Sequence, residues 1–448
     1  MKNIILLMAL FIVQQGLYGQ SDSRDVLAVQ GAPGNSYNWH SNLDLMENDG
    51  YNFRRAFSLS DFNSGLTIGE NVATLDDGVD LPIHNYTNVL GLGHDTGGLA
   101  IRGLKVQNNK ITGQILVGTP NQGSRFLLGL HSSGDGNGNT DLENFVTNME
   151  DWLGGIVCPS CNKTTRLKQY ITGMKNQPYS YGAIYDPNSY YALLPEVDHN
   201  TTAVIWGDAG DQTLGHFLGS NGGPLPGDNV DLQECLDRLI AEKEAALELD
   251  KELLIVSKVS SYFSNYLKVI GGIVSAKGDI GKILAKGGEY IERASDTFIK
   301  EIRAQEKLDK EFKELLICSL ANQRLEAQWR AYVVGGEDNV VSTFVESPDF
   351  DEELCNYWSY QCQYNSYHPD HNTFCENQVM YCGQNVYQLV FEENDFVYSK
   401  TEQQIPNLSR TFKIDANHFQ EQQWARNRVP LERLYSGNEG PEFKVPKF

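Results

Sequence analysis

The chain has little positive charge. Its 448 residues include 36 Lys and Arg against 58 Asp and Glu, which gives a formal net charge of −22. Proteins that bind nucleic acid or anionic membranes gather Lys and Arg on the surface that meets phosphate, because neutralised phosphates supply much of the affinity. The charge balance therefore argues against nucleic acid and against an anionic membrane as partners. The hydrophobic fraction of 40% is nevertheless sufficient for a packed core.

Long apolar runs are also lacking. Ile4–Val13 is a run of ten apolar residues that follows Lys2 and precedes the small residues Gly16 and Gly19. About 20 apolar residues are needed to cross a bilayer, whereas a positive residue, a shorter apolar run and small residues near a cleavage point are typical of an export signal. We expect residues 1–20 to be a signal peptide, the mature chain to be secreted or periplasmic, and no transmembrane segment to follow.

The eight cysteines of an exported chain predict disulfide bonds. The last four are separated by 6, 12 and 6 residues, spacings too wide for the paired cysteines of a zinc site. We expect two local bridges among these four, with three pairings open, and no metal site. The pair at 158 and 161 favours a local bridge over a redox pair or half a zinc site, and the pair at 235 and 318 could join two helices. The full set is Cys158, Cys161, Cys235, Cys318, Cys355, Cys362, Cys375 and Cys382.

Short apolar runs alternate with loops rich in Gly, Asn and Pro over residues 21–230. Each run is bounded by turn residues, as buried parallel strands are, and the intervals leave room for crossover helices. We therefore expect an α/β fold whose mostly parallel sheet is flanked by helices. The expected strands are Val26–Val29, Phe53–Leu59, Val89–Leu92, Ile115–Val117 and Ala203–Trp206.

The composition changes after residue 230. Residues 231–335 contain no proline, and apolar residues recur among charged ones at helical spacing. This predicts a helical hairpin, broken by a glycine-rich stretch, whose apolar faces are buried or form a lid or an interaction surface. A Cys-rich segment follows at 336–385, and strands are expected again at Val386–Phe391 and Phe412–Asp415. The hairpin and the Cys-rich segment are thus predicted insertions into one α/β domain, which resumes at 386–448.

The stretch Val89–Arg102 has the pattern of a nucleophile elbow. An apolar strand runs into Gly93-His94-Asp95-Thr96-Gly97-Gly98 and then into a segment compatible with a helix. In such an elbow the nucleophile lies on a sharp, strained turn, and the glycines leave room for the close approach of strand and helix. The pattern places Asp95 at the nucleophile position. His94 is expected to be a packing residue of the elbow.

Other segments supply the remaining parts of such a site in the matching order. The loop after the first strand would place the backbone N–H groups of Gly31 and Ala32 beside that of Thr96, as donors to a developing negative charge. Downstream, Asp395 and His418 lie 23 residues apart, and each is expected at the end of a strand. Nucleophile, acid and then His is the chain order of the α/β-hydrolases. The alternative acid is Asp211, which follows an earlier strand.

These segments resemble the lipase and PGAP1-like branch of the secreted α/β-hydrolases. GHDTGGLAIR is similar to that branch's GHSMGGLVAR, VGTPNQGS to its GTPHxGS, and NDFV and NHFQEQQ to the segments around its acid and its catalytic His. The matches cover residues 25–124 and 387–428. The resemblance implies an α/β-hydrolase fold, a lipase-like or esterase activity, and a small-molecule or lipid-like ester substrate; the large helical insertion between the matched segments has no counterpart in it. It implies Asp95, Asp395 and His418 as the catalytic residues.

One residue departs from that branch. Asp95 stands where the branch has Ser, and no G-x-S-x-G occurs elsewhere in the chain, so acyl transfer through serine is excluded. Epoxide hydrolases and haloalkane dehalogenases resemble the chain here, with Asp in the elbow and a G-x-P that Gly31-Ala32-Pro33 keeps. The carboxylate could attack carbon in a substitution step, act as a base for water, or belong to an inactive binding protein. In a further alternative, the helical hairpin is the working part of an interaction protein.

A weak calcium motif lies at Asp135, Asn137, Asn139 and Asp141, which place oxygens at alternate positions. The stretch lacks the glycine at the sixth position and the acid at the twelfth position of a calcium loop. A flexible turn explains it equally well, and we expect no cofactor.

Overall fold

The computed structural model describes residues 23–31, 37–59, 68–77, 88–107, 109–131, 141–154, 196–210, 340–346, 350–389 and 393–447, with isolated residues between 167 and 330. The chain divides into two compact units. The first, here the sheet unit, comprises Met1–Asn148, Asn162–Asn229 and Glu393–Phe448. The second, here the ribbon unit, comprises Met149–Cys161 and Val230–Glu392.

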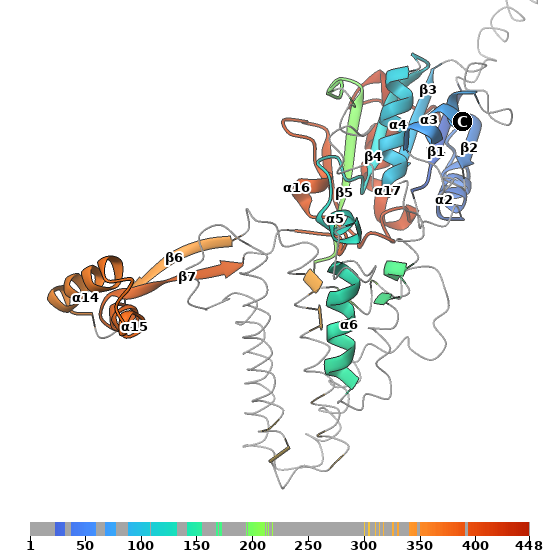
Figure 1. Cartoon of the computed structure of the whole chain (residues 1–448). Helices are drawn as coiled ribbons and strands as arrows, with labels where there is room; N and C mark the ends of the chain where they lie inside the picture. Colours follow the sequence, from blue (N-terminus) through green and yellow to red (C-terminus); the bar gives the residue numbers. More distant parts are fainter. Residues whose placement is uncertain are drawn as a thin grey trace, which may run out of the picture. The chain divides into compact units, whose positions relative to one another are not determined.

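The sheet unit contains a six-stranded parallel sheet (Figure 1). The strands lie in the order β2-β1-β3-β4-β5-β8, and every neighbouring pair is parallel. The predicted α/β fold with a parallel sheet is therefore confirmed. The strands are β1 (Arg24–Val29), β2 (Phe53–Leu59), β3 (Val89–His94), β4 (Ile111–Val117), β5 (Thr202–Asp208) and β8 (Thr411–Asp415).

One face of the sheet carries the main hydrophobic core. Side chains of successive strand residues point to opposite faces, and the register places Ala28 beside Leu92 and Leu92 beside Ile115 on the same face. These residues belong to one buried cluster with aromatic and aliphatic side chains of α2 (Tyr37–Asn48) and α17 (Trp424–Tyr435). Two amphipathic helices far apart in sequence thus cover one face together.

The opposite face is packed closely against α4 (Thr96–Gln107), which follows β3 directly. Gly91 and Gly93 point to this face, and a Cβ at either position would collide with Ile101 or with the backbone of Gly98. The two glycines allow α4 to approach β3 closely, and that approach fixes the turn between them. The remaining helices in the described part of this unit are α3 (Ile68–Asp77), α5 (Arg125–His131), α16 (Lys400–Gln403) and the 3-10 turn η4 (Pro441–Phe443). The residues of α6 (Asp141–Gly154) are divided between the two units after Asn148.

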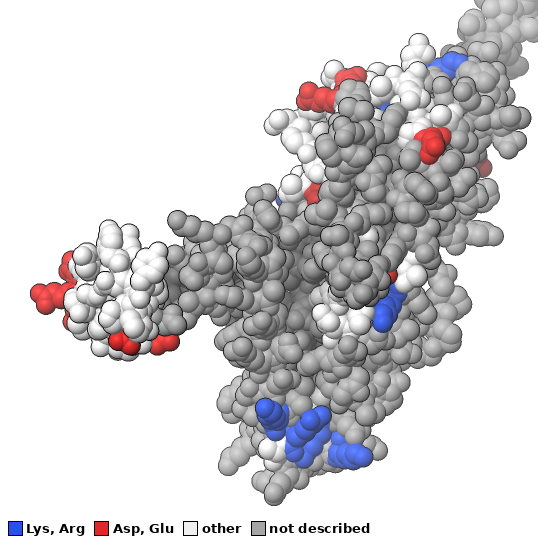
Figure 2. Space-filling view, viewed as in Figure 1, with Lys and Arg blue, Asp and Glu red and all other residues white. Residues whose placement is uncertain are grey.

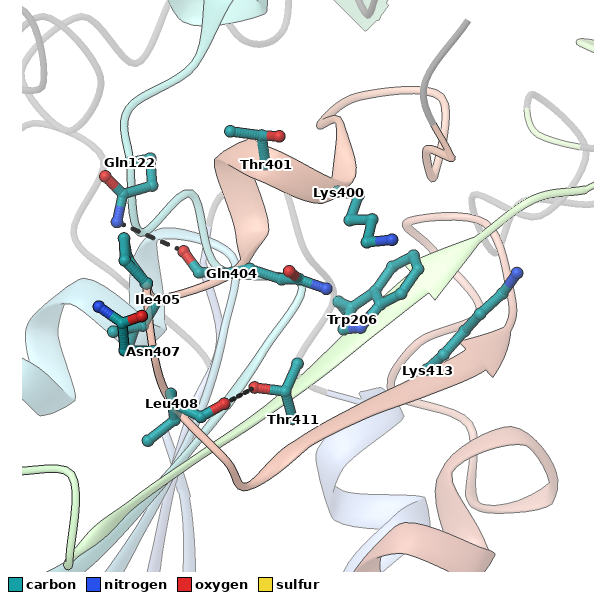
Figure 3. A pocket seen from close by; sticks show the side chains of 11 residues that line it. Gln122, Trp206, Lys400, Thr401, Gln404, Ile405, Asn407, Leu408, Thr411 and Lys413 are labelled. Atoms are coloured by element: carbon teal, nitrogen blue, oxygen red, sulfur yellow. Dashed lines mark hydrogen bonds between the residues drawn. The ribbon is translucent and has the colours of Figure 1, made fainter.

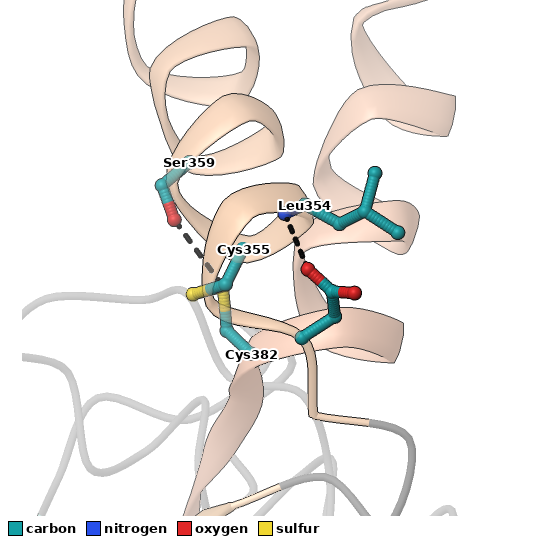
Figure 4. The surroundings of a disulfide bond; sticks show 5 residues. Leu354, Cys355, Ser359 and Cys382 are labelled. Carbon is teal, nitrogen blue, oxygen red and sulfur yellow. Dashed lines mark hydrogen bonds between the residues drawn. A yellow bond between two sulfur atoms is a disulfide. The ribbon is translucent and has the colours of Figure 1, made fainter.

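The ribbon unit contains an antiparallel pair, β6 (Val340–Glu346) and β7 (Gly383–Leu389), joined by α14 (Glu352–Tyr364) and α15 (His371–Cys382) (Figure 1). Two nested disulfides join these helices, Cys355–Cys382 and Cys362–Cys375. Figure 4 shows the first, with the Ser359 hydroxyl beside the sulfur of Cys382. The predicted pair of local bridges is confirmed, with outer and inner cysteines paired. The other four cysteines, Cys158, Cys161, Cys235 and Cys318, lie outside the described residues.

The strand expected at Val386–Phe391 was assigned to the wrong sheet. It overlaps β7, which pairs with β6 and not with the parallel sheet. An alternating strand pattern fits any sheet with a partner, and the partner here is the strand on the other side of the disulfide-bonded helices. The sheet unit resumes at Glu393 and not at residue 386.

Several other predictions concern residues that the structure does not describe. The signal peptide and the calcium motif lie outside the described residues, and so does most of the predicted hairpin at 231–335. Among the residues that are described, no helix is both long enough and apolar enough to span a membrane.

Candidate active site

Asp95 occupies a sharp turn between β3 and α4. Its φ is +52°, in the left-handed region where non-glycine residues are uncommon and strained. The turn is held by the Asp95 N–H, which donates to Val117 O at 3.1 Å, and by the Gly98 N–H, which donates to Asp95 O at 3.0 Å. A Cβ on Gly97 or Gly98 would collide with the Val29 carbonyl or with the Thr119 side chain. The elbow geometry predicted from the glycine pattern is present.

Asp95, Asp395 and His418 lie together at the carboxyl end of the sheet. The His418 Nδ1 is 2.8 Å from Asp395 Oδ2, and its Nε2 is 3.8 Å from Asp95 Oδ1. The His418 N–H also donates to the Asp395 carbonyl at 2.9 Å. All three side chains are buried. The imidazole thus lies between an orienting carboxylate and the carboxylate of the elbow.

Asp395 reaches this position in a way that differs from the sequence prediction. It lies in a turn closed by the bridge between Asn394 and Ser399, and not at the end of a strand of the parallel sheet. The Ala209 N–H, just after β5, donates to the Asn394 carbonyl at 2.6 Å. The chain therefore leaves the sheet after β5 and returns to the same strand end at Asn394. The Asp395 side chain is held by the backbone N–H groups of Val397 and Tyr398, which donate to its Oδ1 at 2.8 and 2.6 Å.

Sequence reasoning missed Tyr398. Its hydroxyl donates to Asp95 Oδ1 at 2.6 Å, and its ring meets the His418 ring edge-on at 5.0 Å between centroids. The side chain is fully buried. The only available signal was its position three residues after the predicted acid, which places it in the same turn. Tyr398 thus fixes the elbow carboxylate on the side that faces His418.

A second tyrosine, Tyr170, lies near the same carboxylates. Burial raises its pKa well above the ordinary value, and the negative charges of Asp95 and Asp395 raise it further. Its hydroxyl has no hydrogen-bond partner among the described residues. Its ring packs against Phe126, Phe217 and Phe419.

Glu421 is a further buried carboxyl group that the sequence did not reveal. Its Oε2 lies 3.2 Å from His418 Nδ1 and 3.1 Å from His94 Nε2, and its Oε1 accepts from the Gly207 N–H at 2.8 Å. A Cβ on Gly118 or on Gly207 would occupy the space of this carboxylate. The fold therefore contains a shaped place for Glu421 directly beside the imidazole of His418.

The carboxylates of Asp395 and Glu421 determine the protonation of His418. Burial alone lowers the pKa of an imidazole, but Asp395 and then Glu421 outweigh burial and raise the His418 pKa well above its ordinary value. Three buried carboxyl groups, those of Asp95, Asp395 and Glu421, surround this one imidazole. The free site accordingly favours a positively charged His418.

His94, in contrast, is neutral. Burial lowers its pKa to about 4 in spite of Glu421. Its Nδ1 accepts from the side-chain amides of Gln30 and Gln422, so its Nε2 carries the proton and faces the His418 carbonyl and Glu421. This agrees with the predicted packing role of His94, and it adds a connection between the elbow and the segment around His418.

Of the predicted oxyanion donors, the structure describes the backbone N–H groups of Gly31 and Thr96, and their surroundings differ. The Gly31 N–H donates to the His94 carbonyl at 2.9 Å, so it is already engaged. A Cβ on Gly31 would lie 2.6 Å from Asp95 Oδ2 and 2.6 Å from the Thr96 nitrogen. Gly31 therefore leaves space beside the elbow, and the Thr96 N–H faces that space. Ala32 and the alternative acid Asp211 lie outside the described residues.

Groups of metal-ligand type occur twice among the described residues. Atoms of His94, His418 and Glu421 lie within 4.8 Å of one another, but the hydrogen bonds above account for their closeness. In the second group, His371 lies beside Cys362 and Cys375, which are joined in a disulfide. Neither arrangement requires an ion.

A groove of about 530 Å³ lies beside β5 and β8 (Figure 3), and Asp95, Asp395 and His418 are not among the residues that line it. Two lysines flank Trp206 there, with their ammonium groups 5.3 and 5.6 Å from the ring centroid. Lys400 is paired with Glu393, and Lys413 is paired with both Glu393 and Asp208. Because these charges are already paired, the groove offers little to an anionic ligand.

Replacing Tyr398 with phenylalanine tests the hydrogen bond to Asp95. Tyr398→Phe should lower the free energy of unfolding by about 1.5–3 kcal/mol, because a buried hydrogen bond to a charged group is lost. Urea unfolding followed by tryptophan fluorescence measures the change. The matched control is Tyr435→Phe, whose buried hydroxyl has no partner among the described residues. Equal effects of the two changes would contradict the contact.

Comparisons with known proteins add little beyond the fold. No family model and no curated protein matches the sequence. An extracellular α/β-hydrolase from a Paenibacillus species is 12% identical, with 41% of this chain and 77% of that chain covered and a TM-score of 0.25. An epoxide hydrolase from hot-environment metagenomes is 14% identical, with 44% and 77% covered and a TM-score of 0.26. A haloalkane dehalogenase from Agrobacterium tumefaciens is 14% identical, with 41% and 72% covered and a TM-score of 0.26.

The fold is that of the α/β-hydrolases. This rests on the parallel sheet, the sharp turn at Asp95 after β3, and the meeting of Asp95, Asp395 and His418, in that chain order, at the carboxyl end of the strands. The identities and TM-scores of the solved structures are too low to indicate a reaction.

Proposed function

We propose that the protein is a hydrolase in which Asp95 is the nucleophile, His418 the general base and Asp395 the residue that orients His418. The observation that carries the proposal is the position of His418 between the two aspartates, with Nδ1 2.8 Å from Asp395 and Nε2 3.8 Å from Asp95. A general base must lie within reach of the reacting group or of one intervening water, and this geometry meets that requirement.

The chemistry follows from the carboxylate at the elbow. An Asp95 oxygen attacks an electrophilic carbon, a carbon–oxygen bond forms, and the bond to the leaving group breaks with its electron pair. Water then loses a proton to His418 and adds to the carbonyl carbon of the resulting aspartyl ester. The ester bond breaks, the alcohol leaves with a proton from His418, and Asp95 is restored with one oxygen from water. An acyl-serine route is closed because Asp95 has no hydroxyl group.

The substrate class follows from this first step. Substitution at carbon suits a small molecule with a strained ring, such as an epoxide, or with a good leaving group, such as an alkyl halide. The flanking segments resemble ester hydrolases, so esters are the second class to test. The two disulfides favour an oxidising compartment, and we propose that the protein acts after export.

Turnover on a panel of epoxides, haloalkanes and esters tests the proposal. The wild type should hydrolyse a member of the first two classes, and Asp95→Asn should lower that rate by at least about 10⁴-fold, because removal of a nucleophile is among the costliest changes to an active site. The matched control is Asp44→Asn, an exposed residue of α2. Wild-type activity in Asp95→Asn would overturn the role of Asp95.

The second candidate is a binding protein without catalytic activity. It is favoured by one observation, the 2.6 Å hydrogen bond from Tyr398 to Asp95, which is shorter than the 3.8 Å separation between His418 and Asp95. A carboxylate held by tyrosine is a weaker nucleophile than one held only by its base. Absence of turnover on all three substrate classes, together with saturable binding of one of them, would favour this candidate.

A further inference from the structure

The ribbon unit presents a small disulfide-linked pair of helices, residues 350–382, here called the knob. α14 contains no buried residue. Its exposed large side chains include three tyrosines, Tyr357, Tyr360 and Tyr364, and Tyr367 beyond its end is fully exposed. The tyrosine stripe is defined as Leu354, Tyr357, Tyr360, Tyr364 and Tyr367. Large side chains that remain exposed together on one element mark an interaction surface more often than scattered ones do.

The stripe lies on one side of the helix. At about 100° per residue, Leu354, Tyr357, Tyr360 and Tyr364 fall within an arc of about 120°. Cys355 and Cys362 lie on the opposite side, where they form the disulfides to α15. Tyr360 and Tyr364 are exposed by 59% and 63%, and their rings lie side by side with centroids 4.9 Å apart. The tyrosines of α14 therefore lie on the side of the helix away from the disulfides, and Tyr360 and Tyr364 form an exposed aromatic pair there.

The knob is held rigidly. The two disulfides link the helices near both ends, and Asp351 caps α14 by accepting from the Leu354 N–H at 2.9 Å. A surface fixed in advance loses little conformational freedom when a partner binds. Tyrosine adds a large contact area with few rotatable bonds, which is why it is enriched at interfaces.

The charge around the stripe is of one sign. No Lys or Arg occurs between Arg330 and Lys400. In the space-filling view the knob shows only acidic and uncharged side chains (Figure 2). The exposed acids of the knob are Asp351, Glu352, Glu353, Asp370 and Glu376. Aromatic faces attract Lys and Arg side chains, and the acids attract the same groups from a distance.

We propose that the tyrosine stripe docks a Lys- and Arg-rich polypeptide surface, through cation–π contacts at the centre and ion pairs with the acids around them. The stripe belongs to the ribbon unit, whereas Asp95, Asp395 and His418 belong to the sheet unit, so this proposal does not depend on turnover at Asp95. A second copy of the chain is a poor occupant, because each copy carries a net charge of −22. An anionic membrane is excluded by the same charge.

The test uses the full chain and a fluorescein-labelled Lys-Ala repeat peptide, with a Glu-Ala repeat peptide as the negative probe. Fluorescence anisotropy should show saturable binding of the first peptide only, weakened when NaCl is raised from about 0.05 to about 0.5 M. The double change Tyr360→Ala and Tyr364→Ala should weaken binding by about fivefold to tenfold, whereas phenylalanine at both positions should preserve it. Val429→Ala, at an exposed site on α17, should have no effect.

A charge-matched pair separates the knob from the net charge of the protein. Glu352→Gln with Glu353→Gln and Asp44→Asn with Glu47→Gln each remove two exposed acids, the first pair from the knob and the second from α2. Only the first pair should weaken binding. Wild-type affinity in the tyrosine variant, equal losses in the two acid pairs, or salt-insensitive binding of a neutral polysaccharide would each overturn the proposal. Unchanged circular dichroism and intact disulfides establish that the variants are folded.

Discussion

Replacing Asp95 with serine is expected to convert a poor esterase into a measurable one. The wild type should hydrolyse p-nitrophenyl esters poorly, because a carboxylate at the elbow cannot form a stable acyl-enzyme. Asp95→Ser introduces a hydroxyl beside His418, in a turn whose φ of +52° already has the elbow geometry. A positioned base that activates such a hydroxyl typically raises the reaction rate by about 10²-fold to 10⁴-fold. We therefore expect kcat/KM to rise by at least about 10²-fold.

The matched control for this change is Asp95→Asn, which removes the charge and adds no hydroxyl. It should show no gain. Initial rates with p-nitrophenyl acetate, measured from neutral to alkaline pH, give the comparison. If Asp95→Ser, Asp95→Asn and the wild type hydrolyse the ester equally, Asp95 does not occupy the nucleophile position.

The second large effect is expected from Glu421→Gln, through the pKa of His418. Asp395 and Glu421 raise that pKa well above its ordinary value, so wild-type His418 keeps its proton to higher pH than an ordinary histidine does, and the rate rises as that proton is lost. Removal of the charge 3.2 Å from Nδ1 lowers the pKa and moves the rising limb of the rate profile to lower pH. The rate at neutral pH should increase severalfold, and an unchanged profile would contradict the role of Glu421.

The raised pKa of His418 also makes the stability of the fold depend on pH. A histidine whose folded pKa is raised contributes stability at pH values below its unfolded pKa of about 6.5. That contribution is lost as the pH rises through the folded value. The free energy of unfolding should therefore fall above about pH 6.5 in the wild type, and in Glu421→Gln this fall should be smaller and should end at lower pH. Titration of the His418 ring protons by NMR measures the pKa without any substrate, and Glu47→Gln on the exposed face of α2 is the control.

The elbow could be predicted because its requirements are local. A sharp turn with close approach of β3 and α4 needs small residues at fixed positions, and Gly93, Gly97 and Gly98 fulfil that requirement. The strands of the parallel sheet were equally accessible, since each is a short apolar run between turn residues. Both predictions depend on neighbours within a few residues.

The rest of the site depends on contacts between distant segments. Asp395 was expected at a strand end, but its turn returns to the end of β5 only after the chain has passed through Val230–Glu392 of the ribbon unit. Glu421 lies in a polar run that has the composition of an exposed loop, and only the absence of side chains at Gly118 and Gly207 makes a place for its carboxylate. No periodicity or spacing in one sequence encodes such a contact.

The measurement that tests the account most directly is isotope incorporation at Asp95. The wild type is mixed in excess over a substrate that it hydrolyses in H₂¹⁸O, so that each molecule turns over once, and the peptide that contains Asp95 is analysed by mass spectrometry. A covalent aspartyl ester predicts ¹⁸O in the Asp95 carboxylate and none in the alcohol product, because water attacks the enzyme carbonyl. The appearance of ¹⁸O in the alcohol, with an unlabelled Asp95, would contradict the nucleophilic role.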